Sequence, residues 1–320
     1  MPAFSTHYLF ANSLKERIAQ ADTNLELCVP ALYYGTQGPD FMFQHRILPW
    51  MKGKCRRNLA SKLHHCDPAK LFFYMGEYLN TADCDKNIVK SYIYGFICHF
   101  SLDRIAHPYV YSVQKKITPM LGAEDYPGFV VHNRIELNID ALLLEEFLGS
   151  RDTRSFHTDK TLLDDERLIS EIGKLMGYAA PKVIDDNSGA DVYTQGLYDM
   201  RYMQSLLSDA RPWLRPTLEA IQLPIRPFMG KAGTSFLRPR KPDMLWDWLN
   251  NAKSVWYGAA YPDVPRTESF KELFEAAQDD AINIISKFDL AMQGKESFDE
   301  LTENMDFDSG TRFDIKVQLP

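Results

Sequence analysis

Apolar side chains recur every three to four residues through most of this 320-residue chain, which is the spacing of helices. This periodicity predicts helices over residues 9–21, 132–147, 163–177, 190–210 and 267–291. Strand-like alternation is scarce, and residues 313–317 form the best strand candidate. The pattern therefore predicts an all-α protein.

Capping residues and prolines indicate where two further helices begin and end. Asp67 and Pro68 look like an N-cap and the first helical position of a helix that runs to about Leu79. Residues 86–107 are apolar nearly all round, which predicts a central buried helix, and Pro108 marks its expected end. Gly149 is the expected C-cap of the helix over residues 132–147.

The sequence suggests a division of the chain into two parts. We expect residues 1–150 to form a helical core and residues 151–320 a helical extension packed on it. We find no internal repeat in the sequence. A long irregular connection is expected over residues 211–242, because this stretch contains six prolines: Pro212, Pro216, Pro224, Pro227, Pro239 and Pro242.

Composition narrows the class of protein. The net charge of −7 argues against a globally basic surface for polyanions, so a phosphate substrate would need a local positive centre. No apolar run approaches the ~20 residues of a membrane span, and the first residues do not resemble a signal peptide. The five cysteines include no CxxC pair, which favours reduced thiols and a cytoplasmic protein.

Histidines and carboxylates share one face of the central helix. His99, Asp103 and His107 are spaced i, i+4, i+8, so their side chains stack along the helix. His132 and Glu136 repeat the i, i+4 spacing in the next long helix. A lone histidine on an apolar helix is usually a core residue, but burying two carboxylates without a charge partner would cost at least ~3 kcal/mol each. A metal cation removes this cost.

These positions belong to a series of motifs that resembles the zinc-dependent phospholipase C family, a relative of the fungal single-strand-specific zinc nucleases. The resemblance covers residues 3–148. The motifs that carry it are Thr6-His7-Tyr8, Gln37-Gly38-Pro39-Asp40, Leu63-His64-His65, His99-Phe100-Ser101-Leu102-Asp103, His107-Pro108 and His132-Asn133-Arg134-Ile135-Glu136.

The resemblance implies a phospholipase C-like helical bundle with three zinc ions in one cleft between its central helices, and for this chain we expect two to three ions. It implies a first zinc site with four ligands, namely Asp40, His64, His99 and Asp103. It implies a second site with three ligands, namely His107, His132 and Glu136. His7 and the second oxygen of a bridging Asp103 would form the third site.

Some assignments stay open at this point. His65 is an alternative to His64 as a ligand. Phe41 occupies the position of an aromatic residue that flanks the lipid headgroup in the phospholipases, although simple packing explains it equally well. The family completes its third zinc site with an N-terminal tryptophan, where this chain has Met1 and Pro2. His45 and His157 have no helical partner and are assigned to the surface or to loops.

These features predict a zinc-dependent hydrolase of phosphate esters, most directly a phosphodiesterase of phospholipase C type. Metal-activated water would be the nucleophile, oriented or deprotonated by Asp40. The expected partner is a small phosphate ester or a phospholipid headgroup, with no stable nucleic-acid partner and no transmembrane segment. The alternatives are a nuclease or nucleotide phosphatase with the same cluster, and a metal-stabilised binding protein without turnover.

Overall fold

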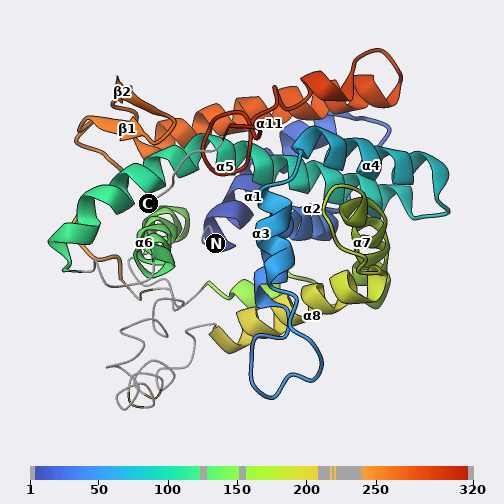
Figure 1. Cartoon of the computed structure of the whole chain (residues 1–320), viewed down its shortest axis with the longest axis horizontal. Helices are drawn as coiled ribbons and strands as arrows, with labels where there is room; N and C mark the ends of the chain where they lie inside the picture. The colour runs from blue at the N-terminus through green and yellow to red at the C-terminus, as the bar shows by residue number, and fades with distance from the viewer. Residues whose placement is uncertain are drawn as a thin grey trace.

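Helices arranged around one long central helix, α5 (Lys86–Met120), make up most of the computed structural model (Figure 1). The structure describes residues 4–122, 128–150, 156–207, 217, 220, 239 and 241–315. The prediction of an all-α protein is confirmed. None of its helices, within the described ranges, has the length and apolarity that crossing a bilayer requires.

The remaining elements are short by comparison. Within the described residues the other α-helices are α1 (Phe4–Ala21), α2 (Val29–Gly35), α3 (Asn58–His64), α4 (Pro68–Thr81), α6 (Gly128–Leu148), α7 (Glu166–Ala179), α8 (Ala190–Leu207) and α11 (Phe270–Met292). The 3₁₀ helices are η1 (Gly38–Gln44), η3 (Thr158–Thr161), η4 (Ala180–Lys182) and η6 (Phe298–Glu300). One antiparallel pair is formed by β1 (Trp256–Gly258) and β2 (Tyr261–Arg266).

Helix α5 is longer than the sequence pattern predicts. It begins where the Asp85 carboxylate accepts hydrogen bonds from the backbone N–H groups of Asn87 and Ile88. The expected end at Pro108 is wrong, because the helix continues to Met120 with Pro108 inside it. A proline removes one backbone hydrogen bond, but Pro108 is buried in the core, and the packing of this apolar helix outweighs that loss. At 1.5 Å per residue, α5 is roughly 50 Å long.

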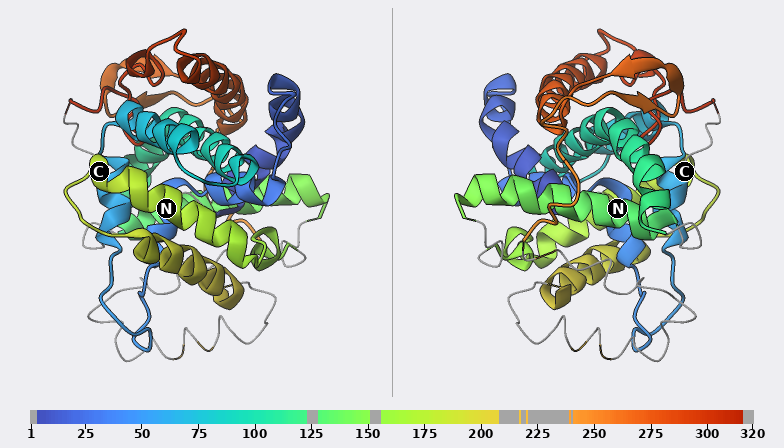
Figure 2. Two further views of the ribbon diagram at one scale, coloured as in Figure 1. Left: turned by 90° about the vertical axis from the view of Figure 1, so that its right-hand side faces the viewer. Right: turned by 90° about the vertical axis from the view of Figure 1, so that its left-hand side faces the viewer.

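Helix α11 lies antiparallel along α5, as the colours in Figure 1 show. The order of their contacts demonstrates the direction, since Tyr109 meets Phe270 near one end and Tyr94 donates a hydrogen bond to Asp289 near the other. Helices α7 and α8 lie side by side across α5 from α11 (Figures 1 and 2). Consequently α5 is covered on several sides, which explains why its sequence is apolar nearly all round.

Two glycines let the backbones of α2 and α5 touch. A Cβ atom on Gly95 would lie 2.2 Å from the carbonyl oxygen of Leu32, and one on Gly35 would lie 2.2 Å from that of Tyr92. Both distances are shorter than any real carbon–oxygen contact. This close crossing positions the segment that follows α2, including η1, against the middle of α5.

The strand assignment requires a correction. Phe313 and Asp314 lie in a turn, and residues 316–317 lie outside the described residues. The strand that forms instead, β2, contains Pro262 and Pro265, which obscure its pattern because prolines are confined to edge strands. The predicted connection over residues 211–242 falls almost wholly outside the described residues.

The α2–α5 crossing yields the first prediction. Gly95→Ala should destabilise the protein by about 1–3 kcal/mol, because an extra methyl group at a filled contact forces the two backbones apart. Urea unfolding measures this change. Gly258→Ala is the control, since its new Cβ would meet Pro108 at an ordinary 3.6 Å. Equal stability of the Gly95 and Gly258 variants would contradict the crossing.

Candidate metal centre

The central helix α5 brings His99, Asp103 and His107 to one side, as their spacing predicts. Asp103 Oδ2 lies 3.1 Å from His99 Nε2 and 3.9 Å from His107 Nδ1. Asp103 is 2% exposed and His99 is fully buried. The carboxylate of Asp103 therefore sits between two imidazoles in the interior of the protein.

Helix α1 supplies His7 from another direction. His7 Nε2 lies 3.2 Å from Asp103 Oδ1, whereas His99 lies against Oδ2, so the two oxygens of Asp103 face different histidines. The rings of His7 and His99 stack with their centroids 4.5 Å apart. This arrangement fits the bridging role that we expect for Asp103, and it places His7 next to the first group of donors.

A buried carboxylate on α6 holds the start of α1 in place. Asp140 accepts hydrogen bonds from the backbone N–H groups of Ser5 and Thr6, at 3.0 and 2.7 Å. A negative charge at a helix N-terminus is favourable, because the first N–H groups have no partner within the helix. Asp140 thus positions His7, which follows Thr6 directly.

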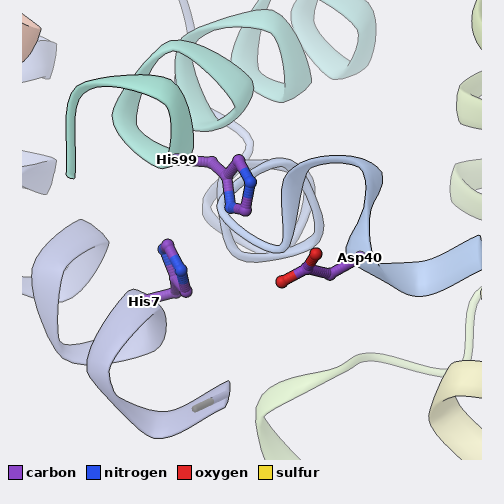
Figure 3. Close-up of side chains that lie close together, drawn as sticks. All are labelled: His7, Asp40 and His99. Atoms are coloured by element: carbon purple, nitrogen blue, oxygen red, sulfur yellow. The ribbon is translucent and has the colours of Figure 1, made fainter. Parts of the chain in front are cut away.

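Asp40 and His64 complete the first group from η1 and α3. His64 Nε2 lies 3.2 Å from Asp40 Oδ1 and 4.0 Å from Asp103 Oδ2. Figure 3 shows His7, Asp40 and His99 converging from three separate elements. Gly38 makes room for this, since it has a φ of +50° and a Cβ atom there would lie 2.0 Å from the His99 ring.

A second group of donors joins α5 to α6. Glu136 Oε1 lies 2.9 Å from His132 Nε2 and 3.4 Å from His107 Nε2. Two donors bound to one tetrahedral zinc ion at ~2.05 Å would lie about 3.3 Å apart. The nearest donor pairs in both groups, 2.9–3.4 Å apart, therefore have the spacing of ligands around a common ion.

Hydrogen bonds on the outer side of the rings orient the imidazoles. In four histidines Nδ1 lies within 3.3 Å of an oxygen acceptor, which assigns the proton to Nδ1 and turns the lone pair of Nε2 inward. The pairs are His64 with Ala60 O, His99 with Thr36 O, His107 with Phe307 O, and His132 with Gln114 Oε1.

Several inward atoms have no hydrogen bond among the residues that the structure describes. They are His7 Nε2, Asp40 Oδ1, His99 Nε2, Asp103 Oδ2 and His107 Nε2. Orphaned buried polar atoms are costly, and a cation satisfies all of them at once. A cavity of about 20 Å³ between His7, Asp103 and Glu136 has room for one ion or water. Imidazole nitrogen and carboxylate oxygen are both donors that zinc accepts.

The electrostatics of the cluster keep two of its carboxylates, Asp103 and Glu136, ionised. Burial raises the pKa of Asp103, yet the attraction of three histidines, His99 foremost, outweighs burial and holds the pKa well below its ordinary value. The same balance, led by the attraction of His132, lowers the pKa of Glu136 to about 2. For His64, burial is outweighed by the hydrogen bond and charge of Asp40, which raise the pKa to about 9. Asp103 and Glu136 are thus ready to bind a cation at neutral pH.

The cluster opens onto a cleft of about 260 Å³. Asp40, His64, His107 and His132 reach this cleft, and aromatic side chains border it. Its lining residues are Asp40, Phe43, Ser61, His64, His65, His107, Tyr111, Gln114, Gly128, Phe129, His132, Asn133 and Asp308. A larger hollow of about 570 Å³, where Lys90 pairs with Asp22 and Asp289, contains no histidine or cysteine among its described lining residues.

The residues that the sequence leaves as alternatives lie in different surroundings in the structure. His64 is buried in the cluster, whereas His65 is exposed at the rim of the cleft. Phe41 is fully buried and packs against Tyr193, which favours the packing interpretation, and Phe43 is the aromatic residue that borders the cleft. Met1 and Pro2, at the third zinc site that the resemblance implies, lie outside the described residues.

Two of the remaining histidines differ in their surroundings. His157 is half-buried just before η3, in a loop as expected. His45 is buried rather than on the surface, and its Nδ1 accepts a hydrogen bond from the backbone N–H of Arg56. The sequence pattern missed this role because the interaction depends on a loop contact and not on helical spacing.

One carboxylate beside the cluster was not expected from the sequence. Asp308 Oδ1 lies 3.1 Å from His107 Nδ1, and Asp308 borders the cleft. The attraction of its histidine neighbours outweighs burial, so the pKa of Asp308 is lowered. The only local signal is the turn-forming stretch Asp306–Gly310, which indicates a turn and gives no hint of its place in the fold.

Comparison with known proteins identifies the family. Residues 6–182, more than half of the chain, match the family model described as zinc dependent phospholipase C. No curated protein and no solved structure matches the chain. The matched residues include every donor of the two groups around Asp103 and Glu136. The chain therefore belongs to the zinc-dependent phospholipase C family.

Proposed function

We propose that this protein is a zinc-dependent phosphodiesterase of phospholipase C type. The observation that carries the proposal is the pair of buried donor groups, which open together onto one cleft. Its metal ligands would be the residues expected from the sequence: His7, Asp40, His64, His99, Asp103, His107, His132 and Glu136. Bound zinc would supply Lewis acidity and a water that ionises near neutral pH.

The cleft depends on metal for its affinity for phosphate. Its described lining residues include no lysine or arginine, although they include two carboxylates, Asp40 and Asp308. A phosphate anion would be repelled by this surface in the absence of a cation. Three zinc ions would set six positive charges against the four carboxylates Asp40, Asp103, Glu136 and Asp308, which still leaves a centre attractive to a phosphate ester.

Asp40 is the residue that we assign to the chemistry. It belongs to both the donor set and the lining of the cleft, so its carboxylate can orient a water and accept its proton. His99 and Asp103 are more deeply placed and do not line the cleft. The aromatic side chains of Phe43, Tyr111 and Phe129 would border the organic part of a small phosphate ester or a phospholipid headgroup.

Metal analysis provides a direct test. Purified protein should contain two to three zinc ions per chain, and removing them should lower the melting temperature. Zinc at a thousandfold excess over its dissociation constant stabilises a folded protein by about 4 kcal/mol. Elemental analysis and thermal unfolding with and without chelator measure both effects. Less than one ion per chain after zinc supplementation, or an unchanged melting curve after verified removal, would refute the metal centre.

The role of Asp40 is tested by comparing three variants. Asp40→Asn should lose at least ~100-fold in turnover, because it removes the basic oxygen, while keeping zinc at the His107–His132–Glu136 group. His99→Ala should lose activity and zinc together. His157→Ala is the matched control and should behave as wild type in turnover and zinc content. Similar activity of the Asp40 and His157 variants would show that the chemistry is assigned to the wrong residue.

A substrate panel separates the possible reactions. With zinc present, we expect hydrolysis of a short-chain phosphatidylcholine or another phosphodiester, abolished by chelator. Release of nucleoside or inorganic phosphate from nucleotides, without diester cleavage, would instead identify a nuclease or phosphatase. A full complement of zinc without hydrolysis of any phosphate ester would overturn the enzymatic proposal and leave a metal-stabilised binding protein.

A further inference from the structure

Residues 301–312 form a compact segment, here called the C-terminal strap, that lies outside the family match. Met305 and Arg312 pair as an isolated antiparallel bridge, and Asp306 N donates to Thr311 O at 2.8 Å. Inside this loop the Asp306 carboxylate accepts a hydrogen bond from the backbone N–H of Ser309 at 2.7 Å. The strap therefore has its own internal hydrogen bonds and presents a defined shape.

Two contacts fix the strap on α5. Arg104 Nη1 donates to the carbonyl oxygen of Thr302 at 3.2 Å, while its guanidinium also pairs with Asp280 on α11. Gly310 has a φ of +65°, and a Cβ atom there would lie 2.7 Å from Pro108 Cγ. The strap thus passes close over the turn of α5 that follows His107.

Phe307 inserts the strap into the cluster. Its side chain is fully buried, with its ring centroid 4.9 Å from that of Phe100, 5.6 Å from His64 and 6.1 Å from His99. The Phe307 ring therefore packs directly against two members of the first donor group, His64 and His99. The next residue along the chain, Asp308, is thereby held beside the second donor group.

Asp308 meets His107 on the side of the ring away from Glu136. Its Oδ1 lies 3.1 Å from His107 Nδ1, and the carbonyl oxygen of Phe307 lies 3.3 Å from the same nitrogen. The opposite nitrogen, Nε2, faces Glu136 at 3.4 Å. The Phe307 carbonyl accepts the hydrogen bond from Nδ1, and the negative charge of Asp308 beside it favours the proton on that nitrogen, so Nε2 presents its lone pair to the ligand group.

We propose that Asp308 is a positioning residue, through which the C-terminal strap orients His107 and raises the metal affinity of the His107–His132–Glu136 group. This inference rests on the proposed metal centre and deepens it, because it makes the second half of the chain part of that centre. A carboxylate behind a metal-binding imidazole fixes its tautomer and increases its basicity, and loss of such a partner typically costs about 10–100-fold in metal affinity.

The test measures zinc binding without any substrate. Full-length wild type, Asp308→Ala and Asp308→Asn are titrated with zinc in competition with a chromogenic chelator. For Asp308→Ala we expect one of the bound ions to bind about 10–100-fold more weakly, with the others unchanged. Asp308→Asn should fall between this variant and wild type, because its amide keeps the shape and a polar oxygen beside His107 Nδ1 but lacks the charge.

The control and the contrary outcomes are distinct. Asp314→Asn makes the same change of charge on an exposed residue that pairs with Arg312, and it should bind zinc as wild type does. Wild-type affinity in Asp308→Ala overturns the proposal. Equal weakening in Asp308→Asn and Asp308→Ala also overturns it, because a charge acting directly on the metal would then explain both.

Two further measurements keep the result interpretable. Melting curves of the metal-free variants report whether the strap still folds, and Asp308→Asn carries the test if Asp308→Ala is unstable. Failure of the proposed reaction is recognised separately, since wild type would then bind its zinc and still hydrolyse no phosphate ester. In that case the affinity change in Asp308→Ala would still support the positioning role.

Discussion

The burial of Asp103 among three histidines is the interaction on which the rest of this structure depends. Both carboxylate oxygens face imidazole nitrogens, and the side chain is 2% exposed. A carboxylate in such a place costs several kcal/mol unless cations surround it. Helices α1, α3 and α6 and the 3₁₀ helix η1 each supply a donor to this cluster, which explains how polar residues occupy the centre of an otherwise apolar bundle.

Close backbone approach makes that cluster geometrically possible. Gly35 and Gly95 let α2 touch α5, and Gly38 then carries the chain past the ring of His99 without a side chain of its own. Asp140 performs the corresponding task on the other side, since it binds the first N–H groups of α1 and so holds His7 over Asp103. These three glycines and Asp140 are not candidate metal ligands, but they fix the positions of the residues that are.

The two halves of the chain contribute differently to the centre. Residues 6–182 match the family and contain the donors, whereas α11 and the C-terminal strap support them from outside that match. Arg104 links all three parts, because it lies between His99 and His107 on α5, pairs with Asp280 on α11 and donates to Thr302 in the strap. Through Arg104, residues 270–312 are attached directly to the helix that carries His99, Asp103 and His107.

The sequence by itself determined the helical class and the donors that follow helical spacing, because His99, Asp103 and His107, or His132 and Glu136, are brought together by the repeat of the α-helix. His7, Asp40 and His64 were found through motif resemblance, and their convergence required the fold. Only the tertiary structure decided the continuation of α5 through Pro108 and the arrival of Asp308 beside His107, some 200 residues apart along the chain. Local patterns do not encode such contacts, since packing against distant segments outweighs the helix-breaking tendency of one proline and selects one carboxylate among many.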